Sequence, residues 1–450
     1  MNFLNQNKIK NNAINIDEIN NIYSLQENTE VIIYGAIYKI RKIGGVTFIN
    51  TRTNKYVVQC VYETSNLKYN INELSLEDCV EIVGYYTKEP RSNLGFEIHI
   101  KHIKLISKKS KDLPLEINNN KKIENLNLNT FLDNKIITMR NEKVRSIYKI
   151  ESGILNGFRD YLINNDFIEF VAPSIVSNCA EGGSELFKVD YFGKDCYLSQ
   201  SPQMYKQIML GTFQKVFTVG PVFRAEKFGT NRHINQFTGL DLEFAYIDSF
   251  EDIMILESKL ICYIYNLLNE KYANELKIVT GKSSLDLPTC FPTMTFDEAK
   301  TLLKNNNQYD SIHINDLSSI EEQWLGNYIL KKYNTPAVFI THYPTTKRPF
   351  YAMEDPKNHN VTLSFDLLLN GAEITTGGQR IHNYNELICK MDRFKMDISQ
   401  YNSYLDLHRY GVPPHGGLGL GLERLTQKIL NIDTIKKTSI FPRERDRILP

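Results

Sequence analysis

The chain has 450 residues, of which 42% are apolar and 23% charged, a composition typical of a soluble globular protein with two or three domains. With 53 basic and 52 acidic residues the formal net charge is +1, which excludes a protein that binds nucleic acid through a general excess of positive charge. The seven cysteines form no CxxC pair, and neither an apolar run of about eighteen residues nor a targeting segment is visible. We therefore expect a cytoplasmic protein without a zinc ribbon, a disulfide framework or a membrane-spanning helix.

Short strands dominate the N-terminal part. β-Branched and aromatic residues gather in several segments that are separated by turn residues such as Gly44-Gly45. These segments are residues 31–34, 46–50, 56–61 and 80–86. Short strands over a length of about 75 residues predict a small β-barrel of the OB type. We place this predicted domain at residues 16–108.

A stretch in which lysines mix with Ser, Asn and Asp, residues 109–135, predicts a hinge or linker. Whether it is simply solvated or touches a nucleic-acid backbone stays open. Beyond it, apolar residues at helical spacing from Ile147 to Leu162 predict a long amphipathic helix. A strand is predicted over Phe167–Val176, interrupted by Pro173, and strands then alternate with helices. We place a second domain at residues 136–450.

The glycine-rich stretch Gly416–Gly421 does not fit a dinucleotide-binding fingerprint, because the third glycine would fall at Leu422 and no strand is predicted before it. No GxxxxGK[ST] phosphate loop occurs either. We interpret the stretch as a tight helix entry from which Arg424 emerges, a side chain suited to stacking on a purine or gripping a phosphate. Residues 270–340 contain a predicted helix, 321–333, but no recognisable chemistry.

A hairpin rich in charged residues is predicted from two strands, Val219–Glu226 and Phe237–Tyr246, joined by a polar loop. Alternate residues of a strand share a face, so Arg224 lies with Glu226. By the same rule Phe237, Gly239, Asp241 and Glu243 share a face. Arg224 suits a phosphate because its planar fork can bond two oxygens. The loop adds Arg232 and His233, placed to reach further phosphates; the alternative is a salt-bridged surface hairpin.

The segment LSQSPQMYKQ, residues 198–207, predicts a helix capped by Ser201 that begins at Pro202. Gln203, Lys206 and Gln207 then share one helical face. A lysine beside a glutamine suits the capture of a small carboxylate, and the alternative is an ordinary surface helix.

A second hairpin is predicted around Asn370-Gly371, a strong signal for a two-residue turn. Such a turn pairs Leu368 with Glu373 and places Asp366 diagonal to Glu373, roughly 7–8 Å away at most. Two carboxylates at that reach can hold Mg²⁺, with phosphate and water oxygens completing the shell. Arg380 follows on the second strand. The alternative is one exposed carboxylate and one structural one.

Taken in order, these segments resemble the class II aminoacyl-tRNA synthetases. Three motifs match. The first ends at Pro173, the second runs from Phe223 to Glu243, and the third runs from Gly417 to Arg424. Within that class the chain resembles the aspartyl-tRNA synthetases of the archaeal and eukaryotic type, on SPQMYKQ, EGGSELF at 181–187, FDLLLNGAE and GGQRIH. The resemblance implies an α+β protein. An N-terminal OB-fold barrel would bind the anticodon, and a class II catalytic domain would follow, an antiparallel sheet flanked by helices.

The resemblance also implies a role for each matching residue. Catalysis is assigned to Arg224 and Arg424. The implied ATP-binding residues are Arg224, Glu226, Arg232, His233, Phe237, Glu373 and Arg424. The implied aspartate-binding residues are Glu181, Ser201, Gln203, Lys206, Arg224, Asp241, Thr376 and Arg380. Mg²⁺ is the implied cofactor, with the ligands Asp366, Glu373 and Thr376. The implied anticodon-binding residues are Arg41, Phe48, Gln59 and Glu97.

The reaction implied by the resemblance needs no protein nucleophile. The carboxylate of L-aspartate attacks the α-phosphate of ATP, and the adenylate passes its aminoacyl group to the terminal ribose of tRNA. Lys206 and Arg380 would bind the side-chain carboxylate of aspartate, while Phe237 and Arg424 would sandwich adenine. The implied partners are aspartate, ATP and tRNA(Asp), with tRNA(Asn) as an open addition. A homodimer through Ile147–Pro173 is also implied, and no membrane partner.

Rival functions stay open. An asparaginyl-tRNA synthetase is the nearest, but a neutral amide would leave Lys206 and Arg380 unsatisfied. A tRNA-independent asparagine synthetase-like ligase would share only the catalytic part, so the predicted barrel argues against it. A non-catalytic RNA-binding paralogue would have lost catalytic residues, and none is lost. The chain departs from the family at Gly35-Ala36, where relatives often have Gly-Trp, and at Thr376, where they often have Ser. We expect Ala36 to relax anticodon reading.

Overall fold

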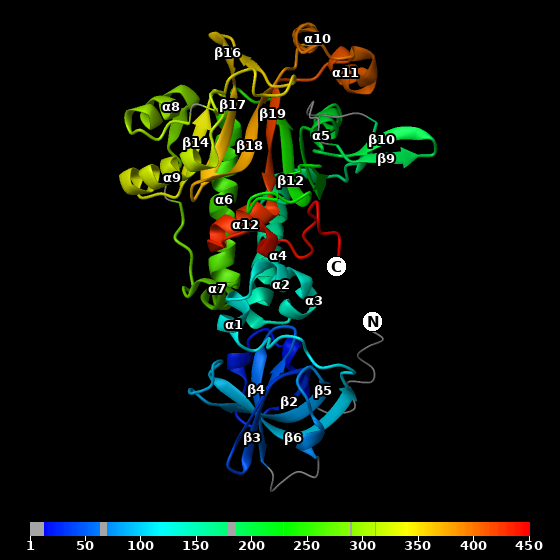
Figure 1. Cartoon of the computed structure of the whole chain (residues 1–450), viewed down its shortest axis with the longest axis vertical. Coiled ribbons are helices and arrows are strands. Elements are labelled where there is room, and N and C mark those ends of the chain that lie inside the picture. Colours follow the sequence, from blue (N-terminus) through cyan, green and yellow to red (C-terminus); the bar gives the residue numbers. More distant parts are fainter. Residues whose placement is uncertain (1–12, 64–69, 178–185, 228, 289, 311) are drawn as a thin grey trace. The chain divides into compact units, whose positions relative to one another are not determined.

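A computed structural model of the chain describes residues 13–63, 70–177, 186–227, 229–288, 290–310 and 312–450 (Figure 1). The chain divides into two compact units, Met1–Glu142 and Lys143–Pro450. Glu181, one of the predicted site residues, lies outside the described residues. No helix in the part that the structure describes is long and apolar enough to cross a membrane.

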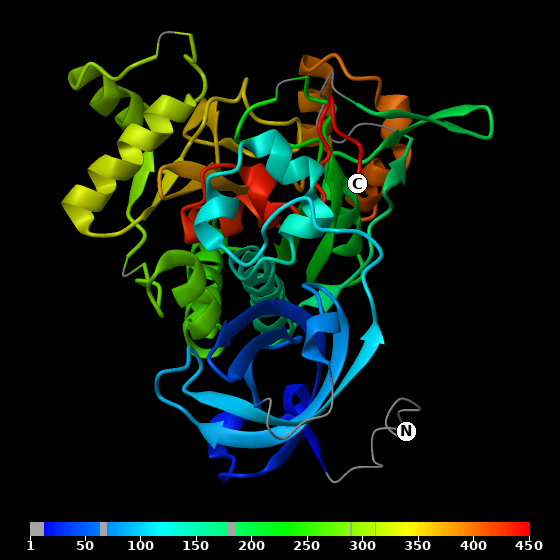
Figure 2. The same cartoon turned by 60° about the horizontal axis from the view of Figure 1, so that its bottom comes forward.

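The first unit contains a closed β-barrel. Its strands are β1 (Ile14–Asn15), β2 (Glu30–Ile43), β3 (Val46–Arg52), β4 (Val57–Glu63), β5 (Cys79–Lys88) and β6 (Phe96–Ser107). The order is β1-β2-β3-β4-β6-β5, and an additional pairing of β2 with β5 closes the ring, which is seen from below in Figure 2. Ile33, Ile49, Val58 and Ile82 are fully buried inside it. The predicted OB-type barrel is therefore confirmed, with β6 as the strand that the sequence pattern did not reveal.

Short helices complete the first unit. They are the 3-10 turns η1 (Ile16–Glu18), η2 (Ile22–Ser24) and η3 (Ile71–Glu73), and the helices α1 (Asn120–Glu124), α2 (Leu128–Asp133) and α3 (Lys135–Thr138). Two of these, α1 and α2, lie in the segment predicted as a hinge. Asparagines cap both, because Asn119 accepts from Lys122 N and Asn127 accepts from Thr130 N. Phe131 is buried, so this segment carries apolar packing of its own.

The second unit is built on an eight-stranded, mainly antiparallel sheet of order β13-β14-β17-β18-β19-β12-β11-β7. In chain order its strands are β7 (Ile168–Glu169), β11 (Lys215–Phe223), β12 (Gln236–Ala245), β13 (Thr293–Thr295), β14 (Ala337–Thr341), β17 (Ser364–Leu369), β18 (Ala372–Arg380) and β19 (His415–Gly421). Smaller sheets contain β8 (Ile175–Val176), β9 (Lys188–Tyr191), β10 (Lys194–Leu198), β15 (Glu354–Asp355) and β16 (Asn358–Thr362).

The helices of this unit pack on the main sheet or on one another (Figure 1). They are α4 (Glu142–Ile163), α5 (Gln203–Met209), α6 (Glu251–Lys271), α7 (Ala273–Thr280), α8 (Phe296–Asn305), α9 (Ser319–Tyr333), α10 (Tyr384–Arg393), η4 (Ile398–Tyr401), α11 (Asn402–Arg409), α12 (Leu422–Leu430) and α13 (Ile435–Thr438). The largest core cluster joins Phe158 of α4 and Ile264 of α6 to Leu240 and Leu242 of β12. Since strand residues alternate, Asp241 and Glu243 lie on the opposite face of β12, away from this core.

Several sequence predictions about local structure need correction. The strand predicted over Phe167–Val176 is two separate strands of two residues, β7 and β8, which belong to different sheets. The strand predicted over Val219–Glu226 ends at Phe223, so Arg224 and Glu226 do not share a strand face. The side chain of Asn235 accounts for the end of the strand. Its amide donates to the carbonyls of Arg224 and Glu226, which in a continuing strand would accept from the backbone of a neighbouring strand.

The glycine-rich stretch is itself the central strand β19, and the predicted helix entry is confined to its last residue, because α12 begins directly after Gly421 and carries Arg424 in its first turn. A side chain at Gly417 would collide with the Glu243 carboxylate, so glycine is required for this close approach.

Other predictions are confirmed. The helix from Ile147 to Leu162 lies within α4, and the helix predicted at 321–333 is α9. The turn at Asn370-Gly371 pairs Leu368 with Glu373 as expected.

Candidate active site

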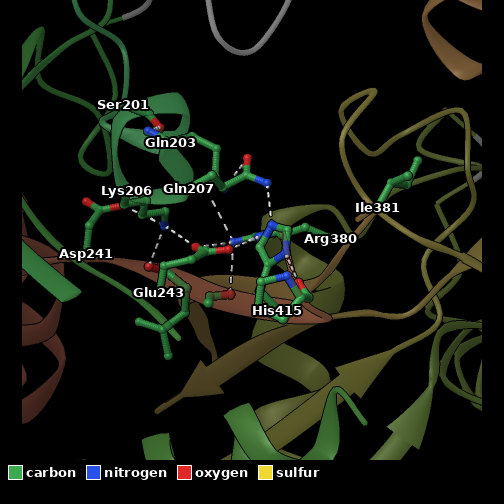
Figure 3. A network of polar contacts seen from close by, with 12 residues as sticks. Ser201, Gln203, Lys206, Gln207, Asp241, Glu243, Arg380, Ile381 and His415 are labelled. Atoms are coloured by element: carbon green, nitrogen blue, oxygen red, sulfur yellow. Dashed lines mark hydrogen bonds and ion pairs between the residues drawn. The ribbon is translucent and has the colours of Figure 1, made fainter. Parts of the chain in front are cut away.

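Two buried cations converge on one buried carboxylate beside the main sheet (Figure 3). Arg380 Nε donates to Glu243 Oε1 at 2.8 Å, and Lys206 Nζ lies 3.3 Å from Glu243 Oε2. Lys206 Nζ also donates to Asp241 Oδ1 at 3.1 Å and to the Leu418 carbonyl at 2.9 Å. Three acceptors therefore surround the three protons of the ammonium group. We call Gln203, Lys206, Asp241, Glu243 and Arg380 the cation pocket.

The charges in the cation pocket are balanced. Burial would raise the pKa of Glu243, but Arg380 and Lys206 outweigh burial and hold the pKa below its ordinary value. Arg380 Nη2 donates to the Gly417 carbonyl at 2.9 Å and to Gln203 Oε1 at 3.3 Å. Its Nη1 makes no hydrogen bond with any residue that the structure describes. Nη1 is thus the guanidinium nitrogen that remains available to a carboxylate.

Helix α5 brings the lysine and the glutamine into this pocket. The helix begins at Gln203 and Pro202 takes the N-cap position, so the prediction that Ser201 caps a helix starting at Pro202 is wrong by one residue; Ser201 Oγ still accepts from Gln203 N at 3.0 Å. Gln203, Lys206 and Gln207 are all buried on one face of α5, as their spacing predicts. The alternative of an ordinary surface helix is therefore wrong. Ser201 also borders a cavity of about 250 Å³.

A second group of predicted residues lies around β12 and the start of α12. Arg224 Cζ lies 5.7 Å from the centroid of the Phe237 ring. A methyl group added at Gly421 would lie 3.7 Å from Arg424 Cβ and 4.0 Å from Phe237 Cδ2, so both side chains flank this glycine. Arg424 Nη1 donates to the Glu373 carbonyl at 3.1 Å. The structure therefore brings Phe237, Arg224 and Arg424 together as a group that can hold a flat ring and a phosphate.

The loop residues Arg232 and His233 lie beside this group. Arg232 Nη1 donates to Glu322 Oε2 at 2.8 Å and its Nη2 donates to the Gly371 carbonyl at 3.3 Å. His233 Nε2 lies 3.8 Å from Glu226 Oε2. Burial lowers the pKa of His233, and nearby arginines add to this effect while Glu226 opposes it. A neutral imidazole at neutral pH follows.

The predicted metal ligands share one hairpin, but its register differs from the simple pattern. A bulge between Leu367 and Leu368 shifts the pairing, so Asp366 lies opposite Thr376 and not opposite Thr375. Thr376 Oγ1 donates to Glu373 Oε1 at 3.1 Å. Burial raises the pKa of Asp366 to about 6, with Glu373 adding to the rise.

Two facing carboxylates and a hydroxyl fit the oxygen chemistry of Mg²⁺. Among the described residues no group of three or more His, Cys, Asp and Glu side chains lies together as a ready metal site. Phosphate or water oxygens would therefore have to complete the coordination of an ion between Asp366 and Glu373.

Three charged residues at the site were not among the assigned binding residues. Glu243 was expected only as a member of a strand face, although it is the acceptor at the centre of the cation pocket. Arg348 Nη2 donates to Asp366 Oδ1 at 2.7 Å and neutralises part of its charge. Glu322 comes from α9, in the region without recognisable chemistry. Burial, reinforced by Glu373, raises the pKa of Glu322 to about 7, with Arg232 opposing.

The four predicted anticodon-binding residues come together on four strands of the barrel. Arg41 Nη2 donates to Gln59 Oε1 at 2.8 Å, and Gln59 Nε2 donates to Glu97 Oε2 at 2.9 Å. Arg41 Cζ lies 5.7 Å from the centroid of the Phe48 ring. The barrel therefore presents an aromatic ring beside a row of polar groups. Proteins that bind single-stranded nucleic acids use such rings to stack on bases and such polar groups to contact base edges.

Comparison with known proteins agrees with this geometry. Residues 127–445 match the family of class II tRNA synthetases (D, K and N). The chain is 38% identical to the aspartate–tRNA(Asp/Asn) ligase of Thermus thermophilus over 94% of this chain and 97% of the relative. It is 36% identical to the aspartate–tRNA(Asp) ligase of Pyrococcus abyssi over 94% and 96%.

Among solved structures, the asparaginyl-tRNA synthetase of Pyrococcus horikoshii in complex with asparaginyl-adenylate superposes with a TM-score of 0.84 at 30% identity, over 94% of this chain and 97% of that one. The aspartyl-tRNA synthetase of Entamoeba histolytica superposes with a TM-score of 0.81 at 28% identity, over 94% of this chain and 90% of that one. Fold similarity therefore extends to synthetases for both amino acids, while the two sequence relatives named above are aspartate enzymes. The chain belongs to the class II aminoacyl-tRNA synthetases, and within that class to the aspartate–tRNA ligases.

Proposed function

We propose that this protein uses ATP to activate L-aspartate as aspartyl-adenylate and transfers the aspartyl group to the 3′ end of tRNA(Asp), with the site residues in the roles given below. The observation that carries the proposal is the cation pocket. Lys206 and Arg380 meet there from different elements, and Nη1 of Arg380 makes no hydrogen bond with a described residue. A side-chain carboxylate is the substrate group that such a pocket accepts.

The same pocket disfavours asparagine. The amide of asparagine brings an NH₂ group as well as a carbonyl, and that NH₂ group would face the donors of Lys206 or Arg380. Leaving buried donors unpaired costs about 1–3 kcal/mol each, which is roughly 5- to 150-fold in selectivity. An asparaginyl-tRNA synthetase and a tRNA-independent asparagine synthetase-like ligase are therefore the less supported alternatives.

Adenylate formation in this site depends on placing the two reactants. The pocket around Lys206 and Arg380 holds aspartate so that its α-carboxylate points to the α-phosphate of ATP. Arg224 grips that phosphate, and Arg424 shares its charge while stacking on adenine opposite Phe237. Glu226 accepts from the adenine amino group. Positioning and charge neutralisation of this kind lower the barrier without a protein nucleophile.

The remaining residues complete the two binding sites. Arg232 and His233 hold the outer phosphates of ATP, and Asp241, Gln203 and Ser201 line the space around the ammonium group of aspartate. Glu181 is predicted to close this space. Asp366, Glu373 and Thr376 would hold Mg²⁺, which when bound supplies positive charge next to the phosphate oxygens.

The range of tRNA substrates is the finer part of the proposal. Relatives with both names exist, since the Thermus protein is an aspartate–tRNA(Asp/Asn) ligase and the Pyrococcus protein an aspartate–tRNA(Asp) ligase. The barrel strand β2 carries Ala36 where relatives often have tryptophan. We propose that the smaller side chain relaxes reading of the anticodon, so that tRNA(Asn) is also charged. An Ala36→Trp variant with unchanged tRNA preference would contradict this.

We also propose a homodimer through residues Ile147–Pro173. Apolar side chains at the end of this segment are exposed in the single chain: Ile163 is 55% exposed, Ile168 45% and Val171 94%. A second copy would bury them. Sedimentation equilibrium tests this proposal, and a stable, active monomer would refute it.

The experiment that tests the function is aminoacylation of purified tRNA(Asp) and tRNA(Asn) with radiolabelled aspartate and, separately, asparagine. Aspartate on tRNA(Asp) alone supports a discriminating enzyme, and aspartate on both tRNAs supports the relaxed one. Charging with asparagine, or no charging at all, would refute the assignment of Lys206 and Arg380 to a carboxylate.

A further inference from the structure

A chain of buried side-chain hydrogen bonds leads away from Arg380 (Figure 3). Arg380 Nη2 donates to Gln203 Oε1 at 3.3 Å, and Gln203 Nε2 donates to Gln207 Oε1 at 3.1 Å. The hydroxyl of Tyr404 donates to the same Gln207 oxygen at 3.2 Å. An arginine side chain has only donors, so the carbonyl oxygen of Gln203 must face Arg380 and its NH₂ group must face Gln207.

The chain ends at His415, the first residue of β19. Gln207 Nε2 lies 2.8 Å from His415 Nε2, and His415 Nδ1 lies 2.8 Å from the carbonyl oxygen of Pro413. A carbonyl oxygen only accepts, so Nδ1 must carry the ring proton and Nε2 must accept from Gln207. Arg380 at one end and the Pro413 carbonyl at the other therefore fix which group donates in each bond: Arg380 donates to Gln203, Gln203 to Gln207, Gln207 to His415, and His415 to the carbonyl.

The surroundings of His415 agree with a neutral ring. The residue is fully buried, and the charged or titratable groups that face it are Glu243 from β12, Arg380 from β18 and His408 from α11. Burial lowers the pKa of His415 to about 4, although Glu243 and the Pro413 carbonyl oppose this while His408 and Arg380 add to it. A protonated ring would put a donor against the NH₂ group of Gln207.

We infer that His415 is a positioning residue of the proposed aspartate site. By accepting from Gln207 it fixes the amide of Gln203, and this amide holds Arg380 in place for the side-chain carboxylate of the substrate. The inference rests on the proposed function and deepens it. It assigns the recognition of aspartate to a directed chain of bonds that starts outside the cation pocket.

The direction of the chain also bears on selectivity against asparagine. While the carbonyl oxygen of Gln203 is bound to Arg380, the guanidinium sets its direction and takes one of its two lone pairs, so it is a poorer acceptor for the NH₂ group of an asparagine side chain. If Gln207 loses its partner, its NH₂ group is buried without an acceptor, and an amide that turns to find one also turns Gln203 away from Arg380. Gln203 then offers an acceptor to asparagine, and Arg380 loses one of its fixed bonds. Loss of His415 should therefore have two effects: weaker binding of aspartate and a smaller preference for aspartate over asparagine.

The test measures ATP–pyrophosphate exchange by the full-length enzyme with aspartate and with asparagine, and compares the wild type with His415→Leu and His415→Gln. In His415→Leu we expect KM for aspartate to rise about tenfold, KM for ATP to stay unchanged and the preference for aspartate over asparagine to fall. In His415→Gln a carbonyl oxygen can take the place of Nε2 as acceptor, and we expect most of the loss to be restored.

The matched control is His408→Asn. His408 is also buried, but its ring nitrogens face the carbonyls of Tyr404 and Ile381 and not a glutamine. This variant should keep the wild-type KM for aspartate. An unchanged KM in His415→Leu, or equal losses in the Leu and Gln variants, would overturn the inference. If the wild type itself forms no adenylate with aspartate, the proposed function and this inference both fail.

A second variant tests the direction of the bonds without removing the histidine. In Gln207→Glu the new carboxylate only accepts, so His415 has to donate from Nε2 and carry two protons. We expect KM for aspartate close to the wild-type value at acid pH and a rise as pH increases and the imidazolium loses its proton. The wild type should lack this rise. Parallel pH profiles of the two enzymes would overturn the inference.

Discussion

Glu257 of α6 is buried, and its replacement by glutamine should change how the stability of the protein depends on pH. The side chain is fully buried, and neither carboxylate oxygen is in hydrogen-bonding geometry with a described residue. Burial, reinforced by the Asp366 carboxylate, raises the pKa of Glu257 from 4.5 to about 8, although Thr375 nearby lowers it a little. Between these two values the folded protein keeps a proton that the unfolded chain releases.

The free energy of unfolding of the wild type must therefore fall as pH rises from the unfolded-state pKa towards the folded-state pKa. Each pH unit in this window corresponds to about 1.4 kcal/mol, so from about pH 5 to about pH 7.5 the loss is roughly 3 kcal/mol. Glu257→Gln has no proton to lose. Its stability relative to the wild type should rise by this amount over the same interval, whatever the constant effect of the buried amide.

The assay is urea unfolding at the two pH values, followed by the fluorescence of the single tryptophan, Trp324. The control is Glu251→Gln, an exposed carboxylate at the start of the same helix, which should show no comparable change with pH. A difference between wild type and Glu257→Gln that is the same at both pH values would refute the reasoning. It would mean that Glu257 is ionised in the folded protein.

Further expected outcomes concern the active site. Lys206→Gln should raise KM for aspartate in pyrophosphate exchange roughly 100-fold, because the buried carboxylates of Asp241 and Glu243 are left with one cation instead of two, and an unchanged KM would contradict this. Arg424→Ala should lower kcat of the same reaction roughly 100-fold with little effect on KM for aspartate. Glu322→Gln should free Arg232 and raise KM for ATP about fivefold while KM for aspartate stays constant, measured by varying each substrate. Chelation of divalent cations should abolish exchange, and added Mg²⁺ should restore it; full activity in excess chelator would exclude the proposed metal site.

Local patterns predicted those parts of the structure whose causes are local. The turn at Asn370-Gly371 set the pairing of Leu368 with Glu373, because turn length fixes register in a hairpin. The face of α5 with Gln203, Lys206 and Gln207 followed from helical spacing. The bulge next to Leu367 did not follow, since it depends on how β18 fits between β17 and β19.

Contacts between segments far apart in the chain could not be predicted from the sequence. Arg348 and Glu322 lie outside every recognised motif, and each acts on a site residue that another element supplies. Nothing local marks them, because a single Arg or Glu in a loop or helix is most often solvated. The anticodon residues are a different case. The resemblance to a family placed Arg41, Phe48 and Gln59 together, although no spacing rule connects three separate strands.

The balance of charge in the cation pocket determines which ligands the pocket selects. Two cations and two carboxylates already neutralise one another there, so a simple anion gains little by entering. A ligand that brings a carboxylate to Arg380 and an ammonium group to Asp241 can supply a new partner for a cation and for a carboxylate of the pocket at the same time. The pocket therefore selects a pair of opposite charges at a set separation, and dicarboxylates without an amino group, such as succinate, should compete poorly with aspartate.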